Sequence, residues 1–175
     1  MKKLTPNHLN QILNELIDNL ALNKNDYVRN PQDHSRKRTL SFSDIIHTIL
    51  EISGGSINSE LLNRYNCAKN TPTSAAFVQQ RSKILTSAFE SLFHSFNDKT
   101  NQNSTFRGYR LFAIDGSDLH IPTNKDDPDS YFSRVNDQRP YNLLHLNALF
   151  DICEETYIDA IIQKSRISNE NQLFF

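Results

Sequence analysis

The apolar residues of this chain change their spacing near residue 100, and this change constrains the fold more than any other feature. Over residues 5–20, apolar side chains recur every three or four positions, as on one face of an amphipathic helix. The run "LFAI" at Leu111–Ile114 is instead continuously apolar, as in a strand covered on both faces. The pattern predicts an α+β protein in which helices come first and strands follow.

The first hundred residues predict five helices. Thr5 provides an N-cap for the first helix, and Gly54 provides a C-terminal stop for the second, which begins near Ser43. We expect the third helix to be capped by Asn58 or Ser59. The last three helices are expected over residues 59–65, 74–83 and 82–96.

A polar stretch without apolar periodicity separates the two patterns and is interpreted as a linker. Beyond it, the extended segments Leu143–Ile152 and Thr156–Gln163 are separated by the short "CEE" and predict a hairpin. Together with Leu111–Ile114 they give three antiparallel strands. The chain therefore divides into a helical unit, a linker and a strand-rich unit, over residues 1–100, 101–108 and 109–175.

Charge is distributed unevenly along the chain. The net charge is −1, but Met1 to Arg110 carry 14 lysines and arginines against 9 acids, whereas Leu111 to Phe175 carry 5 against 11. This asymmetry favours a front half that faces a polyanion and an acid-rich back half that holds metal. Solvated charged faces would produce the same asymmetry, so the two interpretations stay open here.

The sequence indicates a cytoplasmic protein with no membrane partner. No apolar run reaches the roughly 18 residues needed to cross a bilayer. Acids and asparagines interrupt what would be the apolar region of a secretory signal after Lys2 and Lys3. Cys67 and Cys153 lie far apart and lack the spaced partners of a zinc site or a disulfide framework, which predicts reduced thiols.

The stretch "AIDGSDLH" places Asp115 directly after the apolar run. A carboxylate held at the end of a buried strand is the kind of hard oxygen ligand that a two-metal phosphoryl-transfer site needs around Mg²⁺. The alternative is a turn over Asp115, Gly116 and Ser117, and Asp118 has the same two interpretations. Four further acids and histidines lack ligand spacing and are interpreted as surface or hydrogen-bonded residues: His120, His145, Asp151 and Asp159.

A second group of residues suits contacts with DNA. Basic side chains in a polar loop and at a helix end fit phosphates, and glutamines on a helix fit base edges. The two short helices in this region suggest a helix-turn-helix, but the loop between them exceeds its usual turn. An ordinary solvated basic face is the alternative. The candidate DNA-binding residues are Arg36, Lys37, Arg38, Gln79, Gln80, Arg81 and Lys83.

Several separated segments resemble, in order, the N-terminal part of IS4-type bacterial insertion-sequence transposases. These segments are "RKRTLSFSDIIHTILEISGGSINSELL", "SAAFVQQRSKI", "AIDGSDLHIPTN" and "YNLLHLNALFD", followed by "YIDAIIQ" and "NE". The resemblance spans residues 29–170. It implies a catalytic domain similar to ribonuclease H, in which Asp115 is the first of three acids of a D-D-E metal site that uses Mg²⁺. It assigns the first two segments to a DNA-binding region without identifying the residues that touch DNA.

The chain departs from this family after the hairpin. The second acid, in a D-R-G-Y-like segment, and the third, in a Y…R…E…K helix, are expected further downstream, and the final "NENQLFF" matches only as far as "NE". The resemblance therefore implies a truncated or frameshifted copy with an incomplete ribonuclease H-like domain. We expect it to be inactive alone, because one carboxylate cannot hold two Mg²⁺ ions.

These observations lead to three hypotheses about function. The first is a portion of a DNA transposase that binds terminal inverted repeats near the nucleoid and, at full length, performs Mg²⁺-dependent cleavage and strand transfer. The second is a module that binds DNA or pairs with full-length transposase and so inhibits it. The third is a product without function. Because a strand that is apolar on both faces needs cover, we also expect an exposed sheet edge and self-association.

Overall fold

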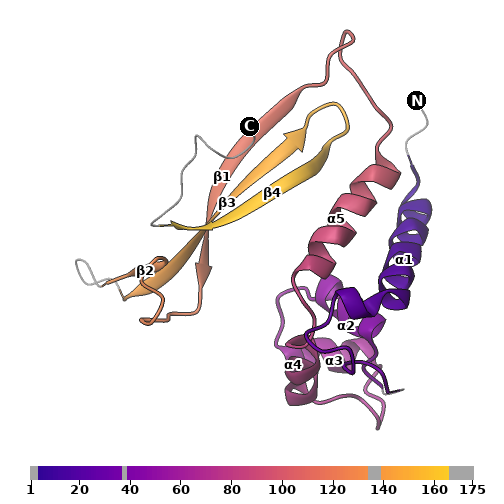
Figure 1. The fold of residues 1–175 in the computed structure, drawn as a ribbon, viewed down its shortest axis with the longest axis vertical. Helices are drawn as coiled ribbons and strands as arrows, with labels where there is room; N and C mark the ends of the chain where they lie inside the picture. Colours follow the sequence, from indigo (N-terminus) through magenta and orange to yellow (C-terminus); the bar gives the residue numbers. More distant parts are fainter. Residues whose placement is uncertain (1–3, 37–38, 134–138, 166–175) are drawn as a thin grey trace. The chain divides into compact units, whose positions relative to one another are not determined.

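The structure is a computed structural model that describes residues 4–36, 39–133 and 139–165. The chain forms two compact units, Met1–Thr100 and Asn101–Phe175 (Figure 1). The residues interpreted as a linker, 101–108, fall in the second unit. The first unit is helical and the second is built on an antiparallel sheet, which confirms the predicted α+β class.

The described part of the first unit contains five α-helices and one short 3-10 helix, and the α-helices correspond to the five that the sequence predicts. Helices α1 and α5 pack against each other, and α2 packs against both α1 and α4. The elements are α1 (Pro6–Leu22), η1 (Lys24–Asp26), α2 (Phe42–Glu51), α3 (Ile57–Arg64), α4 (Ser74–Arg81) and α5 (Ser87–Thr100).

Hydroxyl side chains at the N-cap positions begin four of these helices: Thr5, Ser41, Ser56 and Thr73. Ser41 forms a capping box, because its hydroxyl accepts the Asp44 amide at 3.1 Å while the Asp44 carboxylate accepts the Ser41 amide at 3.1 Å. The prediction that Asn58 or Ser59 caps the third helix is wrong. Ser56 takes this position and accepts the amide of Ser59 at 3.2 Å.

The helices enclose one apolar core. Six of its members have no exposed surface: Ile17, Ile45, Ile46, Leu61, Phe77 and Ala88. Apolar burial of this kind is the main favourable term in folding. Among the described residues, the buried core consists of Ile12, Leu16, Ile17, Leu20, Val28, Leu40, Phe42, Ile45, Ile46, Leu61, Phe77, Ile84, Ala88 and Leu92.

The last helix begins at Ser87 and not at residue 82, as the periodicity predicts. The preceding residues instead join a short two-stranded contact, in which Val28 bridges Ile84 and the Leu85 amide donates to the Tyr27 carbonyl at 2.9 Å. This contact buries Val28 and Ile84 in the core. Tertiary packing therefore overrides the helical pattern at this point.

The second unit is built on a four-stranded antiparallel sheet. Strand β3 lies at its centre, with β1 on one side and both β2 and β4 on the other (Figure 1). The predicted hairpin is confirmed as β3 and β4, whereas β2 was not predicted. The strands are β1 (Phe112–Ile121), β2 (Tyr131–Phe132), β3 (Tyr141–Asp151) and β4 (Thr156–Lys164).

A buried asparagine fixes the long polar excursion between β1 and β3. The Asn142 side chain accepts the Asn124 amide at 2.7 Å and donates to the Asn124 carbonyl at 3.0 Å and to the Ser130 hydroxyl at 2.8 Å. Asp127 continues this network, because it accepts from Ser130 at 2.8 Å and from Lys164 at 2.6 Å. The loop is thus attached to β3 and to the end of β4 by hydrogen bonds and an ion pair.

The sheet leaves much apolar surface uncovered. All β1 residues from Phe112 to His120 are exposed, and Ile114 keeps 58% of its surface accessible. Ile162 on β4 keeps 60%. In the described residues β1 also pairs with β3 alone, so the expected exposed edge is present there. Among those residues, no helix is both long and apolar enough to span a bilayer.

Candidate nucleic-acid interface and acidic strand

Asp115 lies inside β1 and not at the end of a strand. The strand continues through Gly116 and Ser117 as far as Ile121, so the interpretation of Asp-Gly-Ser as a turn is wrong. The register with β3 is uninterrupted, with Asp115 opposite Ala148. The Asp115 carboxylate is exposed and accepts the Gly116 amide at 3.0 Å. Backbone pairing to β3 therefore holds this acid on a regular strand.

Asp115 and Asp118 point to opposite faces of the sheet. Successive side chains along a strand alternate between faces, so residues three apart never share one. The register extends this separation to Asp159, because Asp159 lies opposite Leu149, and Leu149 lies opposite Ile114. Asp118 and Asp159 thus share the face away from Asp115. Neither acid joins Asp115 in one ligand set.

Asp118 is paired with His145. The His145 Nδ1 atom lies 2.9 Å from the Asp118 carboxylate, and the imidazole is mostly buried while the carboxylate is half-exposed. The ring lies directly over Gly116, where an added Cβ would come within 3.0 Å of His145 Nε2 and 3.3 Å of Asn147 Oδ1. The absence of a side chain at Gly116 therefore makes room for this pair. Strand alternation and the cross-strand register explain a contact that linear spacing did not predict.

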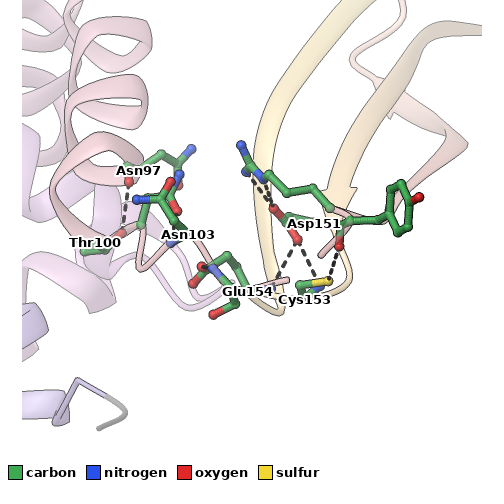
Figure 2. A network of polar contacts seen from close by, with 10 residues as sticks. Asn97, Thr100, Asn103, Asp151, Cys153 and Glu154 are labelled. Carbon is green, nitrogen blue, oxygen red and sulfur yellow. Dashed lines mark hydrogen bonds and ion pairs between the residues drawn. The ribbon is translucent and has the colours of Figure 1, made fainter. Parts of the chain in front are cut away.

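Asp151 has a structural role at the β3–β4 turn. One carboxylate oxygen accepts from Arg110 Nε and Nη2 at 3.1 and 2.6 Å, and the other accepts the amides of Cys153 and Glu154 at 2.9 and 3.2 Å (Figure 2). Burial raises the pKa of the Asp151 carboxyl, but these donors outweigh it and hold the pKa below 3.8. With four donors in place, the carboxylate closes the hairpin. The described residues contain no group of three or more acids, histidines or cysteines that would hold a metal ion.

Three of the candidate DNA-binding residues come together in the helical unit. Arg36, Gln80 and Lys83 line one pocket, although they lie in a loop, on α4 and just after α4. The backbone holds the two segments together, because the Arg29 amide donates to the Lys83 carbonyl at 2.9 Å. The other lining residues are Gln32, Asp33, His34, Ser35 and Leu40.

The pocket residues differ in how accessible their charges are. Arg36 is exposed. Lys83 is partly buried, and its Nζ lies 3.4 Å from Asp33 and 3.3 Å from Gln80 Oε1. Gln80 keeps only 8% of its surface accessible, so it is not placed to reach a base edge as predicted. Arg36 and Lys83 are therefore the cations that this pocket offers to an anion.

Asp33 and His34 set the electrostatics of the pocket. Burial raises the pKa of the Asp33 carboxyl, but hydrogen bonds from Asn30 and Lys83 outweigh it and lower the pKa, so this group is charged at neutral pH. Burial lowers the pKa of the His34 imidazole, which is therefore neutral. Sequence reasoning missed both residues, because neither adds positive charge to the basic segment.

The remaining candidates lie elsewhere. Gln79 and Arg81 are exposed on α4, and the Arg81 guanidinium lies 6.0 Å from the centre of the Phe77 ring. Neither lines the pocket with Arg36. Lys37 and Arg38 lie outside the described residues.

Comparison with known proteins finds no relative. No protein-family profile matches the chain, and neither a curated protein nor a solved structure is significantly similar to it. The geometry of the two units therefore carries the argument about function.

Proposed function

We propose that this chain is the N-terminal portion of an IS4-type DNA transposase and that its helical unit binds the DNA of transposon ends. The observation that carries the proposal is the convergence of Arg36 and Lys83 on one pocket. Cations from separate segments, held together by backbone hydrogen bonds, suit one phosphate group of a DNA backbone. The exposed Arg36 would make the first contact, and phosphate would compete with Asp33 for Lys83.

The sheet supports the first half of the proposal, that the chain is a portion of a transposase. In a ribonuclease H-like domain, Asp115 would supply the first carboxylate of a Mg²⁺ site, with the other acids contributed by the full-length enzyme. Its position on a regular strand and its exposure suit this role. In the cell, the partners would be the terminal inverted repeats and full-length transposase, in the cytoplasm at the nucleoid. Translating the DNA beyond this reading frame in all three frames would reveal whether segments with the second and third acids follow.

Salt-dependent DNA binding tests the proposal. We would measure the association constant of the full chain for a labelled duplex by fluorescence anisotropy over a range of salt concentrations. The duplex is taken from the sequences that flank the reading frame. Each phosphate contact contributes about 0.9 to the slope of log K against log salt. We expect Arg36→Gln with Lys83→Gln to lower the magnitude of the slope by about 0.9, because the two cations share one phosphate, and Arg36→Gln alone to lower it by a smaller amount.

The matched control is Lys99→Gln, because Lys99 is an exposed cation in the last turn of α5 that does not line the pocket. It removes the same charge from the same unit and should leave most of the slope unchanged. Equal losses in the Lys99 and Arg36 variants would mean that the pocket is not a phosphate contact. An association constant that does not change with salt concentration would contradict the proposal itself.

A further inference from the structure

The outer edge of β1 is open in the described part of the chain, where β1 pairs with β3 alone. The carbonyl of Leu111 accepts the Ile152 amide at 2.9 Å, so odd-numbered residues here direct their backbone groups toward β3. Backbone groups alternate along an antiparallel strand. Phe112, Ile114, Gly116 and the following even-numbered residues therefore direct their N–H and C=O groups to the open edge.

The two outer edges of the sheet differ in their protection. The pairing of β4 with β3 shifts register between Leu149 and Phe150, and Lys164 occupies the end of β4. Bulges and lysines are features that keep edge strands from pairing with other chains. The ten residues of β1 contain neither, although Asp115 and Asp118 add charge, and their pairing to β3 is regular throughout. The edge of β1 is thus the better template for an added strand.

We propose that this edge binds β1 of a second copy of the chain, antiparallel and with Gly116 at the centre of the pairing. The proposal does not depend on the proposed function. Two copies joined in this way form one continuous sheet, in which Gly116 faces Gly116 of the second copy. Their even-numbered edge groups then exchange backbone hydrogen bonds, and the Gly116 amide exchanges its contact with the Asp115 carboxylate for one with the second copy.

The charge pattern of β1 disfavours two neighbouring registers, and the side chains opposed in the register centred on Gly116 are compatible. Pairing centred on Asp115 or on Asp118 would place an aspartate directly opposite its own copy, and directly opposed like charges destabilise a sheet. Pairing centred on Gly116 places Asp115 opposite Ser117 of the second copy, where a hydroxyl can donate to the carboxylate. It also places Ala113 opposite Leu119 of the second copy, so that small and large apolar side chains meet.

Sedimentation equilibrium on the full chain tests the interface. Ile114→Asp places an aspartate directly opposite Asp118 of the second copy, and Ile162→Asp is the matched control, because the two isoleucines keep 58% and 60% of their surfaces accessible. We expect the dimer dissociation constant to rise by about tenfold or more with Ile114→Asp and to stay within about twofold with Ile162→Asp. A wild-type chain that stays monomeric, or equal effects of both variants, would overturn the proposal.

Disulfide trapping tests the register without weakening the edge. In a background with Cys67→Ser and Cys153→Ser, Ala113→Cys is mixed with Leu119→Cys. Opposed residues in an antiparallel pair lie about 4.5–5.5 Å apart between Cα atoms, within the range of a disulfide. We expect a cross-link in the mixture but none in either variant alone, since identical positions would be about 20 Å apart. Self-cross-linking of Ser117→Cys, or no cross-link in the mixture, would rule out pairing centred on Gly116.

Discussion

The two units of this protein bury different kinds of side chain. In the described part of the helical unit, fourteen apolar residues form one closed core, and Thr48 and Gln80 are the buried polar residues. In the described part of the sheet unit, the buried set consists of Leu143 and four polar residues: Ser130, Asn142, Asn147 and Asp151. The helical unit is thus stabilised by apolar burial, and the sheet unit depends far more on hydrogen bonds.

This difference predicts that the two units differ in stability. Apolar burial contributes roughly in proportion to area, whereas a typical intramolecular hydrogen bond contributes only about 1 kcal/mol net of water. Because Phe112, Ile114 and Ile162 are exposed, the sheet lacks much of the stabilisation that apolar burial would provide. We therefore expect the sheet unit to gain stability from any strand or surface that covers it, and the helical unit to gain little.

The largest effect is expected from the helical core. Phe77 has no exposed surface, and truncating a buried phenylalanine costs its transfer free energy and leaves a cavity. Phe77→Ala should lower the free energy of unfolding of the helical unit by about 3–5 kcal/mol. Urea unfolding followed by circular dichroism at 222 nm measures this change. Val78→Ala is the control, because Val78 is the next residue of α4 and keeps 40% of its surface accessible, and a loss as large as that of Phe77→Ala would contradict the closed core.

The next effect is expected at the turn of the sheet hairpin. Asp151→Asn removes the charge that accepts from Arg110, and hydrogen bonds to charged groups contribute about 1.5–3 kcal/mol. Because Arg110 is partly exposed, we expect a loss of about 1–2 kcal/mol. Hydrogen exchange of the Cys153 and Glu154 amides should accelerate, while the exchange rates of amides in the helical unit should stay unchanged. Asp115→Asn makes the same charge change at an exposed site of the sheet and should leave those amides protected.

The same carboxylate predicts a dependence on pH. Its folded-state pKa is lowered, so the stabilisation is fully present above the ordinary value of 3.8 and is lost as the pH falls through the lowered value. The sheet signals of wild-type protein should therefore weaken in acid more steeply than those of Asp151→Asn. Parallel acid titrations followed by NMR compare the two proteins. Identical acid profiles would show that Asp151 does not supply this stability.

The smallest effect is expected from Gly116→Ala. The added Cβ would come within 3.0 Å of His145 Nε2, so the ring must shift and its contact with Asp118 must loosen. Overpacking costs about 1–3 kcal/mol, and we expect the lower end of this range because the neighbour is a side chain that needs to move only a little. The His145 ring resonances should move in NMR spectra. They should stay in place in Ser117→Ala, whose side chain lies on the other face.

Much of the fold could be predicted from local pattern, but the candidate sites could not. Helix caps and periodicity depend on neighbours within one or two turns, which explains why the five helices and the β3–β4 hairpin were predicted. The extent of β1 was not, because Asp-Gly-Ser has the composition of a turn and only pairing to β3 keeps it extended. Asp118 and His145 meet for the same reason, since their contact depends on the register between two strands.

The sequence by itself determined the α+β fold class, the order of the two units and the segments that carry basic and acidic side chains. Tertiary structure decided which of those side chains share a site. It brought Arg36 and Lys83 to one pocket, buried Gln80 and placed Asp118 on the face away from Asp115. The physical reason is that composition and spacing act along the chain. Burial and the alternation of strand faces arise only when distant segments pack together.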